Sequence, residues 1–163
     1  MTEPRYTPTL VPLLELQLDI GYERTWHADG VDAPTRSAYP VDGGEFWGER
    51  VRGTVEAVGM DWVRWRADGA MEVDMRTMLR THDDHLVALS YTGLVLVGDD
   101  PENARSARTY TRSAPTDAPV VFSRTTPRFE TSSPEYAWLT RIVAVAKGTR
   151  NDRGPHYSIF EVA

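Results

Sequence analysis

The sequence contains no cysteine and only one lysine, and both absences exclude chemistry. Without cysteine, the chain can form no disulfide, thiolate nucleophile, iron–sulfur cluster or thiolate zinc site. Of the 18 basic residues, all but Lys147 are arginine. A Schiff-base or pyridoxal mechanism would therefore depend on that single side chain.

Long hydrophobic runs, basic clusters and nucleotide-binding motifs are also missing. No apolar run approaches the ~20 residues of a membrane helix, and the N-terminal residues do not resemble a signal peptide. The formal net charge is −6 and the arginines are scattered, which argues against nucleic-acid binding. GxxxxGKS/T, GxGxxG and GxSxG motifs do not occur. We expect a soluble, cytoplasmic protein with no cofactor, no nucleic-acid partner and no membrane partner.

The aromatic residues are mostly of the amphipathic kind. Five Trp and seven Tyr stand against four Phe. Trp and Tyr combine an apolar body with a polar tip, which suits ligand cavities and interfaces, and equally suits half-buried positions in a sheet. With 163 residues, of which 40% are hydrophobic, the chain is expected to form one domain spanning residues 1–163.

Apolar and polar residues alternate with a period of two, which predicts β-strands. The pattern is clearest from Leu14 to Ile20 and from Ala70 to Arg76, and Asp68-Gly69 before the second run predicts a hairpin turn. Ser133-Pro134-Glu135 predicts the start of a helix of one or two turns. Further strands are predicted at 51–57, 62–66, 85–91, 94–97, 119–124, 127–131, 142–146 and 156–162.

These elements predict an all-β fold. Sheet-only chains must hide their edges, and alternation in nearly every strand favours a single closed, mostly antiparallel β-barrel of roughly eight to ten strands with one short helix. Residues 1–10 are expected to be a flexible N-terminus. The polar, turn-rich segment 99–118 is expected to be a long loop.

A series of short motifs occurs in a characteristic order along the chain. The motifs are Gly43-Gly44-Glu45-Phe46-Trp47-Gly48, Gly53, Asp61-Trp62, Asp68-Gly69, Asp74-x-Arg76, Tyr91-x-Gly93, Arg128-Phe129-Glu130-Thr131, Tyr136-x-Trp138-Leu139 and 157–162. Together they resemble the domain of unknown function 3237 family, also called uncharacterised protein family 0311. The resemblance covers residues 12–162 and implies a small antiparallel β-barrel that forms homodimers or larger homo-oligomers. It also implies a place in bacterial small-molecule metabolism, including secondary metabolism, and a compact organic ligand.

The candidate catalytic residues are Asp74, Arg76 and Tyr91. Asp74 and Arg76 are two apart in a predicted strand, so their side chains leave on the same face. In a polar lumen, Asp74 and Tyr91 would handle protons and Arg76 would stabilise a developing anion. The alternative is a structural ion pair on the outer face and a tyrosine in the barrel wall.

A second group of residues is predicted to shape a substrate pocket, and each has a structural alternative. Asp61 follows a turn, and an Asp at such a position more often caps the turn by accepting hydrogen bonds from backbone N–H groups. The cluster from His82 to His85 carries metal-ligating residue types but straddles a turn, so a solvated hairpin is favoured and no metal site is predicted. The predicted pocket residues are Glu45, Trp47, Asp61, Trp62, Arg64, Glu130, Tyr136 and Trp138.

Two ligand-binding functions remain open, beside a scaffold whose barrel is solidly packed and contains no pocket. The favoured one is a cofactor-independent acid–base enzyme, of the isomerase, cyclase, lyase or hydratase type, acting on a small, partly apolar, oxygenated metabolite in the barrel lumen. The other is a binding or carrier protein that holds such a ligand without converting it.

Overall fold

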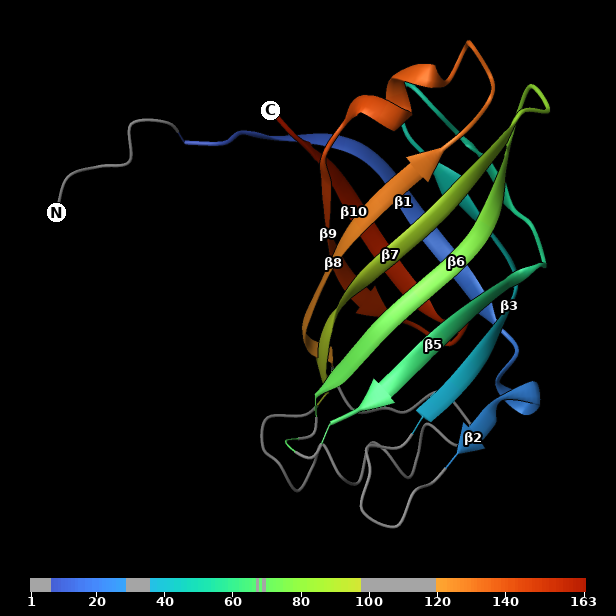
Figure 1. The fold of residues 1–163 in the computed structure, drawn as a ribbon, viewed down its shortest axis with the longest axis vertical. Helices are drawn as coiled ribbons and strands as arrows, with labels where there is room; N and C mark the ends of the chain where they lie inside the picture. Colours follow the sequence, from blue (N-terminus) through green and yellow to red (C-terminus); the bar gives the residue numbers. More distant parts are fainter. Residues whose placement is uncertain (1–6, 29–35, 67, 69, 98–119) are drawn as a thin grey trace, which may run out of the picture.

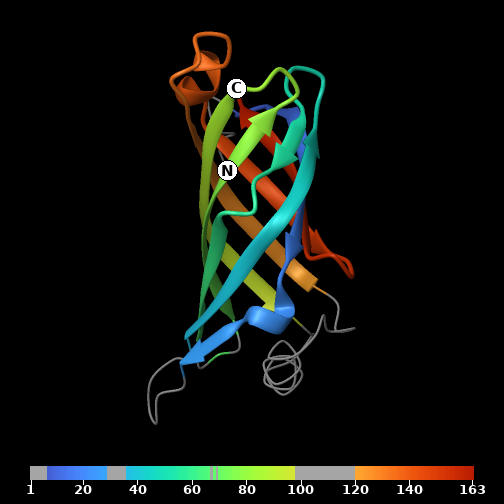
Figure 2. The same ribbon diagram turned by 90° about the vertical axis from the view of Figure 1, so that its right-hand side faces the viewer.

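The computed structural model describes residues 7–28, 36–66, 68, 70–97 and 120–163, which form one closed β-barrel (Figures 1 and 2). Ten strands belong to one sheet, and eight of them close on themselves because the first also pairs with the third. All paired strands run antiparallel. The barrel strands are β1 (Leu10–Ile20), β3 (Arg36–Trp47), β5 (Gly59–Trp65), β6 (Met71–Thr81), β7 (Leu86–Val97), β8 (Val120–Glu130), β9 (Ala144–Arg150) and β10 (Pro155–Val162).

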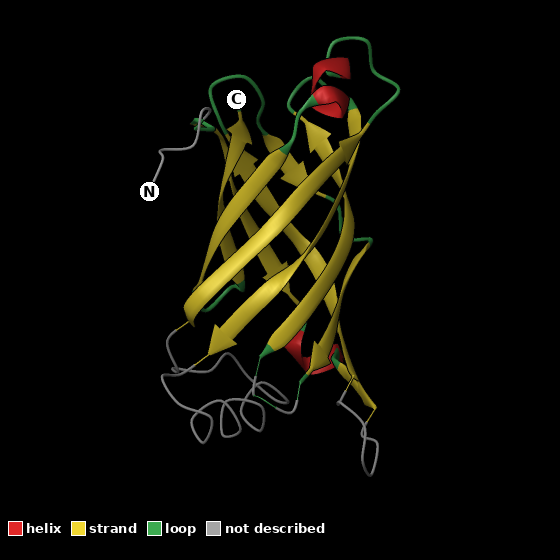
Figure 3. Ribbon diagram, turned by 60° about the vertical axis from the view of Figure 1, so that its left-hand side comes forward, coloured by secondary structure: helices red, strands yellow, loops and turns green. Residues whose placement is uncertain are grey.

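Two short strands and two short helical turns complete the described part of the chain. β2 (Trp26–Ala28) extends the edge of β3, and β4 (Gly53–Val55) bridges β3 and β6 beyond the reach of β5. The helical elements, coloured red in Figure 3, are the 3-10 turns η1 (Tyr22–Arg24) and η2 (Ala137–Arg141). Neither turn has the length or the hydrophobic character of a transmembrane helix.

The predicted fold class is confirmed, and the differences concern boundaries. The short helix after Ser133-Pro134 is present as η2, while η1 had no sequence signal. The two predicted runs on either side of Gly93 form one strand, and so do the predicted runs 119–124 and 127–131. Pro127 is accommodated because it lies beyond the stretch where β8 pairs with β9. The predicted strand at 51–57 is shorter and comprises β4 alone.

Two of the predicted segments lie partly or wholly outside the described residues, which do not include residues 1–6 of the N-terminus. The expected loop at 99–118 falls wholly there. In the expected N-terminal tail, Thr9 and Ala163 exchange two backbone hydrogen bonds of 2.9 Å, and β1 begins at Leu10.

The barrel interior is filled at one end and hollow at the other. Large apolar side chains pack the half of the barrel beneath η2, the upper end in Figure 1, where Leu139 of η2 is buried. The opposite end, near η1, contains a pocket. The filled half contains Leu14, Leu16, Phe46, Val55, Leu79, Val87, Leu89 and Phe129.

Candidate functional site

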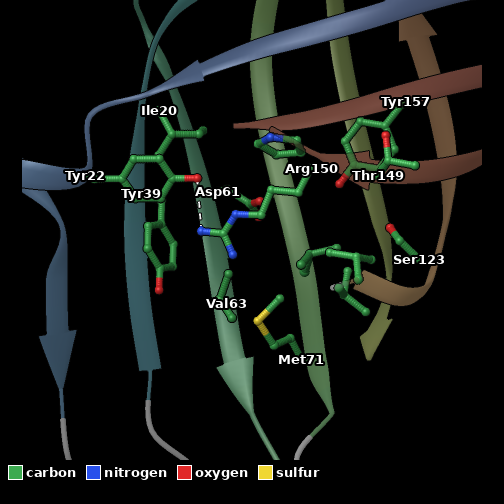
Figure 4. A pocket seen from close by; sticks show the side chains of 14 residues that line it. Ile20, Tyr22, Tyr39, Asp61, Val63, Met71, Ser123, Thr149, Arg150 and Tyr157 are labelled. Carbon is green, nitrogen blue, oxygen red and sulfur yellow. Dashed lines mark hydrogen bonds between the residues drawn. The ribbon is translucent and has the colours of Figure 1, made fainter. Parts of the chain in front are cut away.

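The pocket lies inside the barrel at the η1 end and has a volume of about 70 Å³ (Figure 4). Its wall is largely apolar and is supplied by the ends of most barrel strands. Its polar side chains are fewer and come from η1, β3, β5, β8, β9 and β10. The apolar lining residues are Ile20, Val63, Met71, Val73, Val95, Val120 and Pro155, and the polar ones are Tyr22, Tyr39, Asp61, Ser123, Thr149, Arg150 and Tyr157.

Asp61 is the buried acidic group of this pocket. Along β5 the residues at 59, 61, 63 and 65 are buried and those between them are more exposed, so Asp61 shares the inner face with Val63 and Trp65. The side chain is only 6% exposed, and its Oδ1 atom has no hydrogen-bond partner. Burial, together with the negative charge of Asp74, raises the pKa of Asp61 from 3.8 to about 7. Asp61 therefore takes up and releases its proton at a much higher pH than an ordinary aspartate.

Two tyrosines lie beside Asp61 in the interior. Tyr91 of β7 and Tyr157 of β10 face each other across the barrel, with ring centroids 5.0 Å apart. The register of β5, β6 and β7 places Asp61 and Tyr91 on either side of Met75, all on the inner face. Burial and neighbouring acidic groups raise the pKa of both phenols, so both stay protonated at neutral pH. The Tyr91 hydroxyl has no hydrogen-bond partner.

This arrangement suits proton transfer in a protected environment. A carboxyl group with a pKa near 7 can both accept and return a proton at neutral pH. Neutral phenols are hydrogen-bond donors that can hold a substrate oxygen on which negative charge develops. Unpartnered buried polar atoms are costly, about 1–3 kcal/mol each, and in native proteins they call for a specific explanation such as a ligand or a catalytic role.

The structure does not bring Asp74 and Arg76 into this pocket. Both side chains lie on the outer face of β6, 47% and 77% exposed, with their charged groups 3.6 Å apart. The reason is the strand period, because Val73, Met75 and Thr77 occupy the inner face. The expectation of a lumen lined by Asp74 and Arg76 is corrected: of the three candidate catalytic residues, Tyr91 alone points inward.

Four of the predicted pocket residues also lie on the outer surface. Arg64 is paired with Glu72, and Trp62 is 54% exposed on the same face. The remaining two lie on β3, where the Glu45 carboxylate accepts a hydrogen bond of 2.8 Å from Arg153 and Trp47 packs against His156, with centroids 5.6 Å apart. The four residues on the outer surface are thus Glu45, Trp47, Trp62 and Arg64. Among the predicted pocket residues, Asp61 alone lines the pocket.

The other three belong to the opposite end of the barrel. Tyr136 is buried, and its hydroxyl donates a 2.7 Å hydrogen bond to Asp83 in the β6–β7 turn. Hydrogen bonds from Thr81 and Tyr136 hold the pKa of Asp83 at about 2. Trp138 lies under the Arg50 guanidinium at 3.6 Å, and Glu130 is exposed at the end of β8. These residues close the filled end and take no part in the pocket.

The His82 to His85 cluster lies in that same β6–β7 turn. Both histidines approach Asp83 at 3.8 Å. In the part of the chain that the structure describes, no group of three or more His, Asp or Glu side chains is arranged to hold a metal ion.

Several pocket residues had not been singled out as site residues from the sequence. Tyr157 and Ser123 occupy the buried phase of β10 and β8, which a strict reading of the alternation would have indicated. Tyr22 and Arg150 had no such signal, because one lies in the unpredicted turn η1 and the other at the last position of β9.

The fold and the pocket define an eight-stranded antiparallel barrel that is filled at one end and hollow at the other. The chain belongs to the family described as "Protein of unknown function (DUF3237)", whose model matches residues 8–162. The UPF0311 protein RPA1785 of Rhodopseudomonas palustris is 28% identical over 145 residues, which cover 89% of this chain and 92% of the relative. The UPF0311 protein CA_C3321 of Clostridium acetobutylicum is 28% identical over 115 residues, 71% of this chain and 70% of the relative.

Solved structures show the same barrel. The "beta-barrel like protein" ABAYE2633 of Acinetobacter baumannii aligns with a TM-score of 0.81 and 26% identity, covering 99% of this chain and 100% of that one. RPA1785 itself aligns with a TM-score of 0.83 and 25% identity, covering 97% and 99%. A protein of Penicillium herquei described as an enzyme aligns with a TM-score of 0.72 and 19% identity over 100% of both chains, a likeness of fold alone.

Proposed function

We propose that this protein is a cofactor-independent acid–base enzyme that acts on a small, partly apolar, oxygenated metabolite. The observation that carries the proposal is Asp61, a buried carboxyl group that lines an internal pocket, has an unpartnered oxygen and has a pKa raised to about 7. Perturbed carboxyl groups in pockets are characteristic of catalytic acids and bases. Because Asp74 and Arg76 lie on the outer face of β6, we assign the proton-handling role to Asp61. Tyr91 keeps the role that the sequence-based hypothesis gave it.

The simplest chemistry is a proton shift. Ionised Asp61 removes a proton from a carbon next to a carbonyl group, and the electron pair moves onto the carbonyl oxygen. The Tyr157 hydroxyl, which lines the pocket with Tyr91 behind it, donates a hydrogen bond to that oxygen. Protonated Asp61 then returns the proton at another atom, so the product is an isomer and the enzyme is restored. When the proton instead leaves with a hydroxide group, the result is loss of water.

The barrel of Penicillium herquei supports the proposal in one respect, because a protein of this fold is described as an enzyme. Fold alone does not carry function. The argument therefore rests on Asp61 and its neighbours.

The test is a turnover screen without a preset substrate. The purified protein is incubated with a small-molecule extract, and all masses and retention times are compared by liquid chromatography and mass spectrometry. We expect one compound to be replaced by an isomer, or by a species differing by one water. Asp61→Asn should lower this conversion by about 100- to 10,000-fold, the usual contribution of a general base.

Two matched variants make the screen decisive. Asp84→Asn makes the same chemical change at an 81% exposed carboxylate in the β6–β7 turn, and it should convert the compound at the wild-type rate. Asp74→Asn tests the residue on the outer face. Loss of the conversion in Asp74→Asn, with the conversion retained in Asp61→Asn, would refute the assignment of Asp61.

A compound that co-purifies with the protein and is never converted would favour the carrier function, which the largely apolar wall of the pocket also suits.

The pH dependence of turnover gives a second test. Since the base is the ionised form of Asp61, we expect the rate to rise about tenfold per pH unit below pH 7 and to level off above it. The rate is measured on the identified compound from pH 5 to pH 9. A flat profile through pH 7 would contradict the assignment of Asp61 as the base.

A further inference from the structure

Among the described residues that line the pocket, Arg150 is the one with a positively charged side chain. It stands at the last position of β9, opposite Pro155 in the β9–β10 hairpin, and it has the inward phase of Ala144, Ala146 and Gly148. Figure 4 shows its guanidinium reaching toward Tyr22. The Tyr22 hydroxyl accepts a 3.1 Å hydrogen bond from Nη2, and the guanidinium carbon lies 5.4 Å from the centroid of the Tyr22 ring.

The charge of Arg150 is not neutralised by an acidic side chain of the described residues. Two arginines on the outside of the barrel differ in this respect. Arg80 and Arg153 each form ion pairs with carboxylate oxygens at 2.5 to 2.8 Å. Arg150 donates its hydrogen bond to the Tyr22 hydroxyl, and Asp61, the acidic residue of the pocket lining, is not among its hydrogen-bond or ion-pair partners. A guanidinium has five N–H donors in a fixed fork, and the bond to Tyr22 uses one of them.

Much of the wall around the polar side chains of the pocket is apolar. This apolar surface includes Val63 of β5, Met71 and Val73 of β6, and Val95 of β7. A molecule that satisfies all of these neighbours has an anionic group for Arg150, an apolar body, and a reacting portion beside Asp61 and Tyr157. Among anionic groups, a carboxylate matches the planar fork of a guanidinium with two parallel hydrogen bonds.

We propose that the pocket takes a small, largely apolar carboxylate whose carboxylate group binds Arg150. The proposal names the substrate class of the site and rests on the function proposed above. Tyr22 holds the guanidinium in place and leaves its remaining donors for the ligand. The aliphatic wall then excludes water around the body of the molecule, which strengthens the ion pair at Arg150.

The experiment uses pairs of probes that differ in charge alone. A panel of small monocarboxylates, such as hexanoate and benzoate, is compared with the corresponding primary amides by isothermal titration calorimetry on the full chain. We expect carboxylates to bind about 10- to 100-fold more tightly than their amides, the range for hydrogen bonds to charged groups. Equal binding of acid and amide, or no binding of any carboxylate, overturns the proposal without any variant being needed.

Variants then locate the preference. Arg150→Gln should abolish the preference for the carboxylate, whereas Arg150→Lys, which keeps the charge and loses the fork, should retain part of it. Arg128→Gln makes the same change on the exposed outer face of β8 and should leave the preference intact. A preference that persists in Arg150→Gln overturns the proposal.

Asp61→Asn separates this proposal from the proposed function. It should still bind carboxylates in preference to their amides, because Arg150 is unchanged and the substitution removes a negative charge from the pocket. Binding that depends on Arg150, without turnover that depends on Asp61, would refute the proposed enzymatic function and support a carboxylate as the ligand. Asp61-dependent turnover without charge preference would do the reverse.

Discussion

Replacing Asp61 by Asn is expected to raise the free energy of unfolding by about 4 kcal/mol at pH 8, while turnover is lost. The carboxyl group has a pKa of about 7 in the fold against an ordinary value of 3.8. Each pKa unit corresponds to about 1.4 kcal/mol, so ionising Asp61 in the folded state costs on the order of 4 kcal/mol relative to the unfolded chain. Asn has nearly the same shape and no charge to bury.

The sign of the pH dependence follows from proton binding. Between pH 3.8 and about 7 the unfolded chain has released the Asp61 proton and the folded chain has kept it. Stability attributable to this group therefore falls as pH rises through that window, and it is constant above and below. Urea unfolding at pH 5 and at pH 8 measures the effect as the difference between wild type and Asp61→Asn. The difference should be larger at pH 8.

Asp84→Asn is the control for that measurement. Asp84 is exposed and has a φ of 70°, which Asn adopts as readily as Asp, so its stability should stay within about 0.5 kcal/mol of the wild type at both pH values. An Asp61→Asn variant that is no more stable than the wild type at pH 8 would show that Asp61 is ionised without cost, and the pocket would lose its candidate base.

Gly44→Ala is expected to destabilise the protein by about 3 kcal/mol or more. Gly44 has a φ of 138°, a backbone conformation that residues with a Cβ rarely adopt. A Cβ at this position would also lie 2.1 Å from the backbone oxygen of Gln17 on β1. The barrel is closed here by the pairing of β1 with β3, so the backbones of these two strands would have to move apart.

Gly43→Ala is the matched control for this prediction. Gly43 has a nearly identical φ of 140°, yet the nearest atom to its added Cβ would be the Val55 oxygen at 3.6 Å, an ordinary contact. Its cost should be confined to backbone strain, about 1–2 kcal/mol. Thermal or urea unfolding of both variants measures the difference, and equal losses would show that the β1–β3 approach is not a constraint.

The catalytic proposal and the stability prediction are two consequences of one cause. Asp61 is costly to the fold because it is buried without full hydrogen bonding, and the same burial gives it a pKa suited to proton transfer. A substitution that stabilises the protein and abolishes its activity would be the signature of such a site.

The sequence by itself determined the strands, and through them the fold class. Apolar residues at every second position can bury one face of a strand and no more, so a chain of such strands has to close or stack its sheets. The same period contained information on the site. Asp61 is a polar residue in the phase of Val63 and Trp65, whereas Asp74 is in the polar phase of β6, opposite to Met75. Applying the period strictly would have placed Asp61 inside and Asp74 outside.

Only the tertiary structure decided which residues meet. Asp61, Tyr91 and Tyr157 lie on β5, β7 and β10, and closure of the barrel alone brings these strands around one interior. Which end of the barrel is filled and which is hollow depends on side-chain volumes summed over eight strands and on what η1 and η2 contribute, which no local pattern records. Arg150 and Tyr22 meet across 128 residues of sequence for the same reason.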